Sequence, residues 1–170
     1  MIKKHVFFPG VITDPSVIRE VTGNNAITGQ LATLEGYGLY TQRLDQVPDR
    51  AREILRRNWQ EGFKSYVLKK DNMGRVEGAV YSGLTEEDLE ALDDWELVEL
   101  GWMVRNKGRA RLVDGRLVNV AAFVITDGQE VEEKIEGSEY NPWIIGREDL
   151  IAQAKRTRKE YLERKSKNSP

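Results

Sequence analysis

The stretch VEGAVYSGLTEEDLEALDDWE, residues 76–96, joins a strand pattern to a short acidic helix, and this unit decides the expected fold. Its strand pattern is part of residues 64–84, which are typical of a hairpin with a turn at Asp71–Gly74. Thr85 precedes Asp88 by three residues, which is a variant of the capping box that begins helices. The acids of the first turn also complement the helix dipole. A short helix is therefore predicted directly after the strand.

The acids of this helix are the first candidates for chemistry. Leu89 and Leu92 can face a core, which leaves the other acids of the helix in water. Most acidic clusters of this kind are simply the solvated face of a helix. Glu96 ends the run and has two interpretations, an ordinary exposed carboxylate or a catalytic acid/base.

The remaining elements lie on both sides of this unit. Strand patterns cover residues 2–8 and 26–44, and two or three further strands follow within residues 96–128, with a hairpin turn at Asp114–Gly115. Helix patterns cover residues 14–23, residues 48–62 and the region from Gly146 onward. This order is not a regular βαβ alternation, so we expect an α+β fold, a small mixed, mostly antiparallel β-barrel with flanking helices. The expected division is one domain at 1–150 and a basic C-terminal helix or tail at 151–170.

The composition excludes several classes of protein and of site. The chain has 170 residues, of which 39% are hydrophobic and 32% charged, and this suits a globular domain. Its net charge of −2 gives no global reason to expect nucleic-acid binding, and no apolar run approaches the roughly 18 residues of a membrane span. Cysteine is absent, which excludes disulfides, thiol nucleophiles and thiolate metal sites. We expect a cytoplasmic protein without a metal site.

A single histidine, His5, removes most of the remaining catalytic chemistry. A histidine-rich zinc site is impossible, and a Ser-His-Asp triad would have to use this residue of an early strand. A lone histidine is usually structural. If the protein is an enzyme, its proton transfers are therefore expected to fall to a carboxylate.

Four stretches in sequence order resemble the gamma-glutamylcyclotransferase-like family, also called the avirulence-induced-gene group. Members typically begin with a strand, a Tyr-Gly-Thr/Ser-Leu loop and a helix opening with Asp-Pro, which VFFPGVITDPSVI at 6–18 resembles. ATLEGYGLY at 32–40 is similar to the family's Gly-Tyr-x-Leu-Tyr strand. Residues 76–96 resemble its Val-x-Gly-x-Val-Tyr strand and Leu-Asp-x-aromatic-Glu segment, and VNVAAFVIT at 118–126 resembles a later strand. The resemblance covers about residues 5–126.

This resemblance implies a mixed barrel with the site at one mouth, and a reaction that needs no cofactor and no metal. Family members typically release 5-oxoproline from a small gamma-glutamyl amine, because the substrate's α-amine attacks its own γ-carbonyl and expels the amine. Glu96 matches the family's catalytic glutamate, which takes a proton from the α-ammonium group and returns it to the leaving amine. Trp95, in the family's aromatic position, is expected to keep water away from Glu96.

The substrate-binding residues implied by the resemblance come mainly from the opening loop. Pro9, Gly10, Val11 and Ile12 stand where the family has Tyr-Gly-Thr/Ser-Leu. The N–H groups of the last three can hold the substrate's α-carboxylate or the developing oxyanion. Tyr40, at the end of the second motif, is added as a binding residue.

The chain departs from the family pattern at the first loop and after the acidic run. Pro9 has no hydroxyl where the family has tyrosine, and Leu100 and Trp102 replace the tyrosine and arginine that many members carry. Three residues are candidates to compensate: Tyr40, Tyr81 and Arg105.

These departures keep two alternatives to the enzyme open. The first is a noncatalytic or diverged ligand-binding member of the same fold, acting as a regulatory or interaction domain. The second is an interaction protein that uses residues 155–167, where seven Lys/Arg face two Glu. The second alternative competes with a simpler one, in which these residues form a solvated helix. The oligomeric state stays open.

Overall fold

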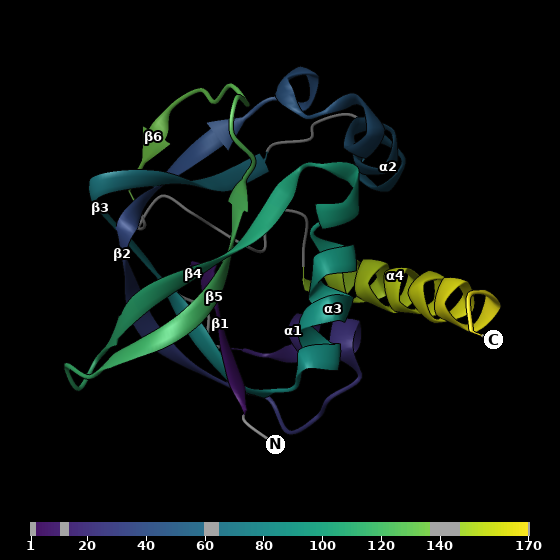
Figure 1. Ribbon diagram of the computed structural model, residues 1–170, viewed down its shortest axis with the longest axis horizontal. Helices are drawn as coiled ribbons and strands as arrows, with labels where there is room; N and C mark the ends of the chain where they lie inside the picture. The colour runs from purple at the N-terminus through teal and green to yellow at the C-terminus, as the bar shows by residue number, and fades with distance from the viewer. Residues whose placement is uncertain (1–2, 11–13, 60–64, 137–146, 170) are drawn as a thin grey trace.

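A computed structural model describes residues 3–10, 14–59, 65–136 and 147–169 of the chain (Figure 1). Its strands are β1 (Lys4–Pro9), β2 (Thr28–Gln42), β3 (Ser65–Leu84), β4 (Met103–Leu112), β5 (Leu117–Ile125) and β6 (Lys134–Ile135). Its helices are α1 (Ser16–Thr22), α2 (Asp49–Trp59), α3 (Glu86–Trp95) and α4 (Arg147–Lys167), with 3₁₀ turns η1 (Leu44–Gln46) and η2 (Val98–Leu100). No helix in the described ranges is long and apolar enough to cross a membrane.

Five strands close into a barrel. Around the ring the order is β1, β3, β2, β4 and β5, and each neighbouring pair is antiparallel except β5 with β1, which is parallel and closes the ring. The short β6 pairs with β2 outside this ring. The predicted fold class, a small mixed and mostly antiparallel barrel with flanking helices, is confirmed.

The segment around Asp71–Gly74 is a bulge, so the hairpin predicted within residues 64–84 is wrong. Both halves of β3 pair antiparallel with the same strand, β2, and the register shifts between Glu35 and Tyr37 of β2. Gly74 is required there, because a Cβ atom on it would lie 2.2 Å from the carbonyl oxygen of Tyr37. The glycine therefore serves a close approach of two backbones rather than a chain reversal.

Strand alternation separates two hydrophobic cores. Neighbouring residues such as Val6 and Phe7 are both buried, because one side of β1 faces the barrel interior and the other faces the helices. The barrel core contains only strand residues, among them Phe7, Leu34, Val80 and Ala122. The helix-layer core lies between the outside of the barrel and the helices, and it includes Val6, Tyr81, Leu92, Phe123 and Ala154.

All four helices of the described ranges contribute to the helix-layer core, and α2 does so through Ala51 and Leu55. Figure 1 shows α1, α3 and α4 together on one side of the barrel, with α4 extending away from it. Helix α1 ends at Gly23, whose positive φ of 73° suits glycine, and the Arg158 side chain of α4 donates to the nearby carbonyl of Val21 at 3.0 Å. Helix α3 begins with the predicted capping box, since Thr85 Oγ1 accepts from the Asp88 N–H and Asp88 Oδ2 accepts from the Thr85 N–H. Local sequence signals therefore set where these helices begin and end.

His5 has a structural contact in β1. Its Nδ1 atom lies 2.8 Å from Ser82 Oγ on the paired strand β3. The histidine thus joins two strands of the barrel.

Candidate active site

Glu96 extends the core-facing stripe of α3. Leu89, Leu92 and Glu96 are spaced at i, i+3 and i+7, which places them on one face of a helix. Both leucines are buried, and Leu92 has no exposed surface. Glu96 is the residue that ends the helix, and its N–H still donates to the Leu92 carbonyl at 2.9 Å. Its side chain therefore begins on the face of α3 that is turned toward the barrel.

Two apolar residues flank Glu96 in the chain. Trp95 and Leu97, its two neighbours in the chain, are both partly buried and both pack against the helix-layer core. Glu96 as a whole residue keeps some exposure, whereas its carboxyl group lies deep enough for burial to raise its pKa to about 7. Within the ranges the structure describes, no hydrogen bond or ion pair reaches this carboxyl group. The result is a desolvated carboxylate that titrates near neutral pH.

Four other acids of α3 form ion pairs with basic residues of β4 and α4. Arg105 of β4 donates to Asp93 at 3.1 Å and to Glu86 at 3.0 Å. Asp94 pairs with Arg164 of α4. A further pair joins Glu87 to Lys165 of the same helix at 3.2 Å. Arg105, a residue expected to compensate for the lost family arginine, is therefore already engaged in two ion pairs.

The opening loop uses one of its expected donors within the barrel. Pro9 is the last residue of β1 and lies opposite Gly78 of β3, and the Gly10 N–H donates to the carbonyl of Glu77 at 3.1 Å. Gly10 has a φ of 104°, a conformation that suits glycine. Val11 and Ile12, the other expected donors, lie outside the described residues. A binding cradle made by this loop stays a prediction.

Aromatic rings fill the space between the end of β1 and the next strands. Phe8 stacks on Phe123 with ring centroids 5.8 Å apart and meets the edge of Tyr81 at 6.0 Å. Burial, together with the charge of Asp14 nearby, raises the pKa of Tyr81 to about 12. Tyr81 therefore keeps its proton at neutral pH. Asp14, which follows the opening loop in the sequence, lies near it. No periodicity or motif in the sequence favours Tyr81 over Tyr40 as a residue that compensates for the lost family tyrosine.

Tyr40 belongs to the same layer but to another strand. It lies on β2 opposite Lys134 of β6 and packs against the helix-layer core. Its role in substrate binding is not tested by these contacts.

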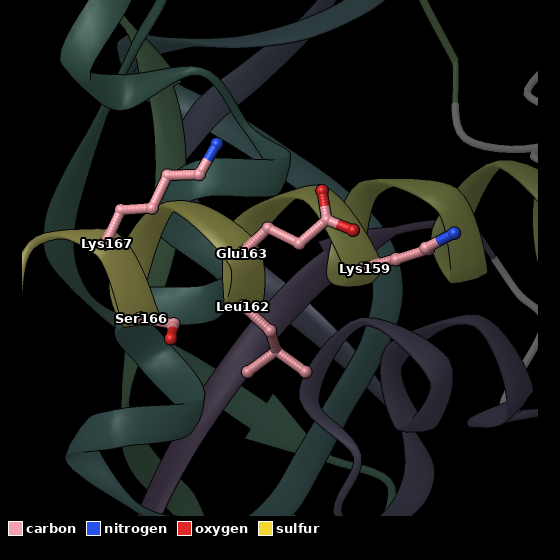
Figure 2. A pocket seen from close by; sticks show the side chains of 5 residues that line it. All are labelled: Lys159, Leu162, Glu163, Ser166 and Lys167. Carbon is pink, nitrogen blue, oxygen red and sulfur yellow. The ribbon is translucent and has the colours of Figure 1, made fainter.

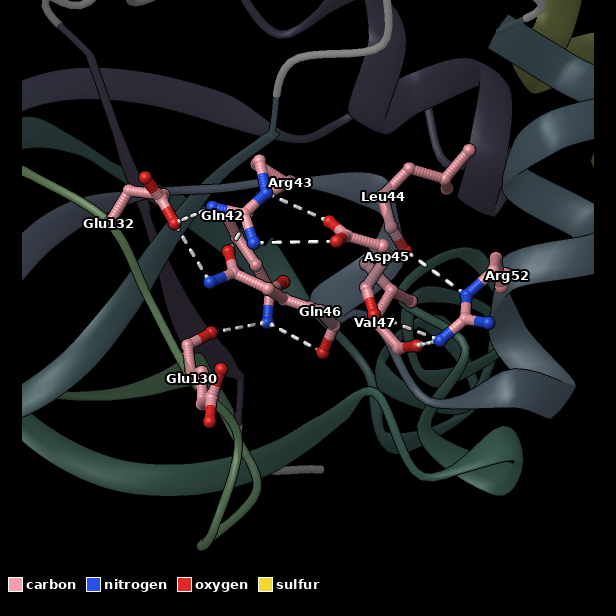
Figure 3. A network of polar contacts seen from close by, with 9 residues as sticks. All are labelled: Gln42, Arg43, Leu44, Asp45, Gln46, Val47, Arg52, Glu130 and Glu132. Atoms are coloured by element: carbon pink, nitrogen blue, oxygen red, sulfur yellow. Dashed lines mark hydrogen bonds and ion pairs between the residues drawn. The ribbon is translucent and has the colours of Figure 1, made fainter.

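Trp102 is a core residue in the position where the resemblance expects an arginine. It is buried, and its indole N–H donates to Gln42 Oε1 at 3.0 Å. The Gln42 amide in turn donates to the carbonyl of Glu130 at 3.2 Å, within a polar network that joins the end of β2 to η1 and to the segment before β6 (Figure 3). Trp102 thus anchors the strand that leads out of α3 and offers no charge to a substrate.

A shallow hollow of about 420 Å³ lies elsewhere, on the outer turns of α4 (Figure 2). Its lining comes from that helix alone: Lys159, Leu162, Glu163, Ser166 and Lys167. It includes none of the expected site residues. Over the described part of the chain, no group of three or more His, Cys, Asp or Glu side chains is placed to hold a metal ion.

Comparison with solved structures identifies the fold. A gamma-glutamyl cyclotransferase superposes with a TM-score of 0.56 at 14% identity, covering 98% of this chain and 86% of that chain. An uncharacterized protein from Homo sapiens gives 0.55 at 15% identity, covering 97% and 85%. A protein from Arabidopsis thaliana gives 0.53 at 19% identity, covering 100% and 96%. The chain has the fold of the gamma-glutamyl cyclotransferases, as its sequence motifs predicted.

The sequence itself finds no match in the other two comparisons. No protein-family model matches it, and no curated protein matches it significantly. At 14–19% identity the structural likeness establishes the fold and leaves the reaction to be argued from the residues.

Proposed function

We propose that this protein is a cyclotransferase that converts a small gamma-glutamyl amine into 5-oxoproline and the free amine, with Glu96 as its general acid/base. The observation that carries the proposal is the Glu96 carboxyl group on the core-facing stripe of α3, which has no hydrogen bond or ion pair with any described residue and whose pKa burial raises to about 7. An exposed helix-end glutamate, the competing interpretation, would titrate near its ordinary value of about 4.3.

The raised pKa suits the proton transfers of the reaction. The substrate's α-ammonium group has a pKa of roughly 8, so a base with a pKa near 7 can take its proton with little cost. The freed amine attacks the γ-carbonyl carbon and forms the new C–N bond of a five-membered ring. When the old C–N bond breaks, the protonated Glu96 returns its proton to the departing amine nitrogen. The ring nitrogen then gives up its second proton through Glu96, so that the amine leaves as an ammonium ion and Glu96 is ionised again. Atoms and charge balance without a covalent enzyme intermediate.

Most of the acceleration would come from holding the two ends of one substrate together. Intramolecular attack at close range is worth on the order of 7–11 kcal/mol. Trp95 and Leu97 support this role because they exclude water beside the base. The Gly10 N–H is occupied by Glu77, so the proposal does not use it as an oxyanion donor.

The direct test is release of 5-oxoproline from a panel of gamma-glutamyl amines. Glu96→Gln should reduce kcat by about 10² to 10⁴-fold with the fold intact, because the amide cannot accept the proton. In the parent protein kcat/KM should fall as the pH drops below about 7, since Glu96 must be ionised to act as the base. Glu99→Gln, an exposed acid three residues further on, is the matched control and should keep the parent rate. Turnover by Glu96→Gln at the parent rate would refute the proposal.

The buried position of Trp102 supports the second candidate, a diverged ligand-binding member of the same fold. Where the resemblance expects an arginine, this chain offers an indole that is bonded to Gln42 inside the protein. The same panel separates the two candidates. Compounds that raise the melting temperature without releasing 5-oxoproline would favour the binding protein.

A further inference from the structure

Leu97 adopts a backbone conformation that side chains other than glycine rarely take. Its φ is 53° and its ψ is 41°, and no other non-glycine residue in the described ranges has a positive φ. Such left-handed residues are held in place only where the surrounding structure determines them, and they gather at functional sites. Leu97 directly follows Glu96.

The turn at Leu97 ends α3 and folds the chain back. The Leu97 N–H donates to the carbonyl of Asp94 at 3.1 Å, which caps the last turn of the helix. The Leu97 carbonyl then accepts from the N–H of Leu100 at 3.1 Å and from that of Trp102 at 3.4 Å. Since Trp102 is buried and bonded to Gln42, the loop is fixed at both of its ends. The direction in which the chain leaves Glu96 is thereby set by the conformation of one residue.

Glycine is the usual residue for this kind of helix end, so the leucine side chain must have a use. That side chain is partly buried and packs against the helix-layer core, and it belongs to the residue directly after Glu96. A glycine would allow the same turn but would remove this apolar side chain from the helix-layer core. The left-handed turn and the apolar cover are thus combined in one residue.

Among the described residues, no charged group opposes or adds to the effect of burial on the pKa of Glu96. On α3 itself, Asp93 is turned to Arg105 of β4, and Asp94 to Arg164 of α4. On β3, Tyr81 is protonated at neutral pH, and its nearest charge is Asp14 after the opening loop. Burial is the cause of the raised pKa of Glu96. Access of water to the carboxyl group is therefore what a neighbour can change.

We infer that Leu97 is a positioning residue for Glu96: its left-handed turn fixes the path of the chain directly after Glu96, and its side chain shields the Glu96 carboxylate from water. The inference deepens the proposed function and rests on it for its catalytic meaning. It assigns to Leu97 the role of keeping Glu96 basic enough to accept the substrate's proton.

The experiment is a titration of Glu96 by carboxyl ¹³C NMR in the parent and in Leu97→Gly, with the signal assigned by its loss in Glu96→Gln. Leu97→Gly should lower the midpoint by at least about one pH unit toward the ordinary glutamate value. The acidic limb of the kcat/KM profile should move in the same direction and by a similar amount. A role in packing alone would lower stability and leave both midpoints where they are.

A second variant and a control complete the test. Leu97→Asn keeps a side chain that tolerates the left-handed conformation but brings a polar amide to Glu96, so it should also lower the midpoint if Leu97→Gly folds poorly. Leu100→Ala removes an equally partly buried side chain from the same loop and should leave the midpoint unchanged. An unchanged midpoint in a folded Leu97→Gly or Leu97→Asn overturns the inference. If the parent releases no 5-oxoproline, the proposed function fails while the titration still decides the role of Leu97.

Discussion

The two faces of α3 carry the same kind of side chain under opposite conditions. On the outer face, Asp93, Asp94 and Glu87 each meet a basic residue from β4 or α4. On the inner face, Glu96 continues the stripe of Leu89 and Leu92 and meets no cation of the described residues. The difference teaches that an acidic run is not one feature, because orientation decides which carboxylate is structural and which is available for chemistry.

Burial raises the pKa of carboxyl groups on both faces, but only on the outer face does a nearby cation oppose this rise. Burial raises the pKa of Asp93 and of Asp94, and Arg105 and Arg164 oppose this rise. For Glu96 burial acts alone and brings the pKa to about 7. A nearby cation favours the charged form of a buried carboxyl group. A buried carboxyl group that has no cation near it exchanges protons near neutral pH.

The largest expected effect, and the strictest test of the difference between the two faces, comes from neutralising Glu96 and measuring the stability of the fold. The pKa of Glu96 is higher in the folded than in the unfolded protein, so ionised Glu96 lowers the stability of the fold. This loss is absent below about pH 4.5, grows between pH 4.5 and 7, and is complete above pH 7. Glu96→Gln should therefore raise the free energy of unfolding at pH 8 by on the order of 2 kcal/mol, allowing for the partial exposure of the residue. At pH 4 the variant and the parent should agree. Urea denaturation at the two pH values measures this, with Glu99→Gln as the control; a gain that is equal at both would contradict the assigned cause.

The next largest effect should come from removing the cation of the outer face. Asp93 Oδ1 is buried and has no hydrogen-bond partner among the described residues, so the carboxylate depends on Arg105 through its other oxygen. Arg105→Met should lower the free energy of unfolding by about 1–2 kcal/mol at pH 7, because a half-buried charge loses its partner. The loss should shrink as the pH falls and Asp93 takes up a proton. Arg109→Met, on the exposed side of the same strand, should cost little in the same urea assay. An equal loss in both variants would mean that the pair with Asp93 has no special weight.

The smallest effect belongs to the pair between α3 and the far end of α4. Lys165 and Glu87 are both largely exposed, and water screens such pairs. Lys165→Met should leave the free energy of unfolding close to that of the parent, as should Lys155→Met elsewhere on α4. A larger loss, measured by urea denaturation at low salt and abolished at high salt, would show that exposed charges hold α4 in place.

Sequence reasoning reached the fold through local patterns together with the family resemblance, and it singled out Glu96 through the resemblance of residues 76–96 to a family motif. The capping box of Thr85 and Asp88, the bend of β2 at Gly36 and the hairpin at Asp114–Gly115 are all encoded by short-range chemistry, and the structure contains each of them. The i, i+3, i+7 spacing from Leu89 to Glu96 was also readable before any coordinates. It is the signal that separates this acid from its neighbours.

The features that the sequence left undetermined depend on contacts between distant residues. Turn residues at Asp71–Gly74 fit a hairpin or a bulge equally well until the partner of each half is known, and both halves pair with β2. The basic run at 155–167 suggested an external acidic partner, whereas Arg158, Arg164 and Lys165 all contact the chain's own α1 or α3. The turn at Leu97 had no signal, because leucine has no local preference for it.

The separation of the two hydrophobic cores has a consequence for how the molecule comes apart. Glu96, Leu97 and Trp95 all belong to the layer outside the barrel, which is held by helix packing and by half-exposed ion pairs. The closed ring of strands has its own interior and its own ladder of backbone hydrogen bonds. Structural units of this kind open with different free energies, and the one with fewer enclosing contacts opens first. The architecture thus allows the helix layer that contains Glu96 to fray reversibly while the strands stay assembled, so that loss of the arrangement around Glu96 under mild stress need not mean loss of the native topology.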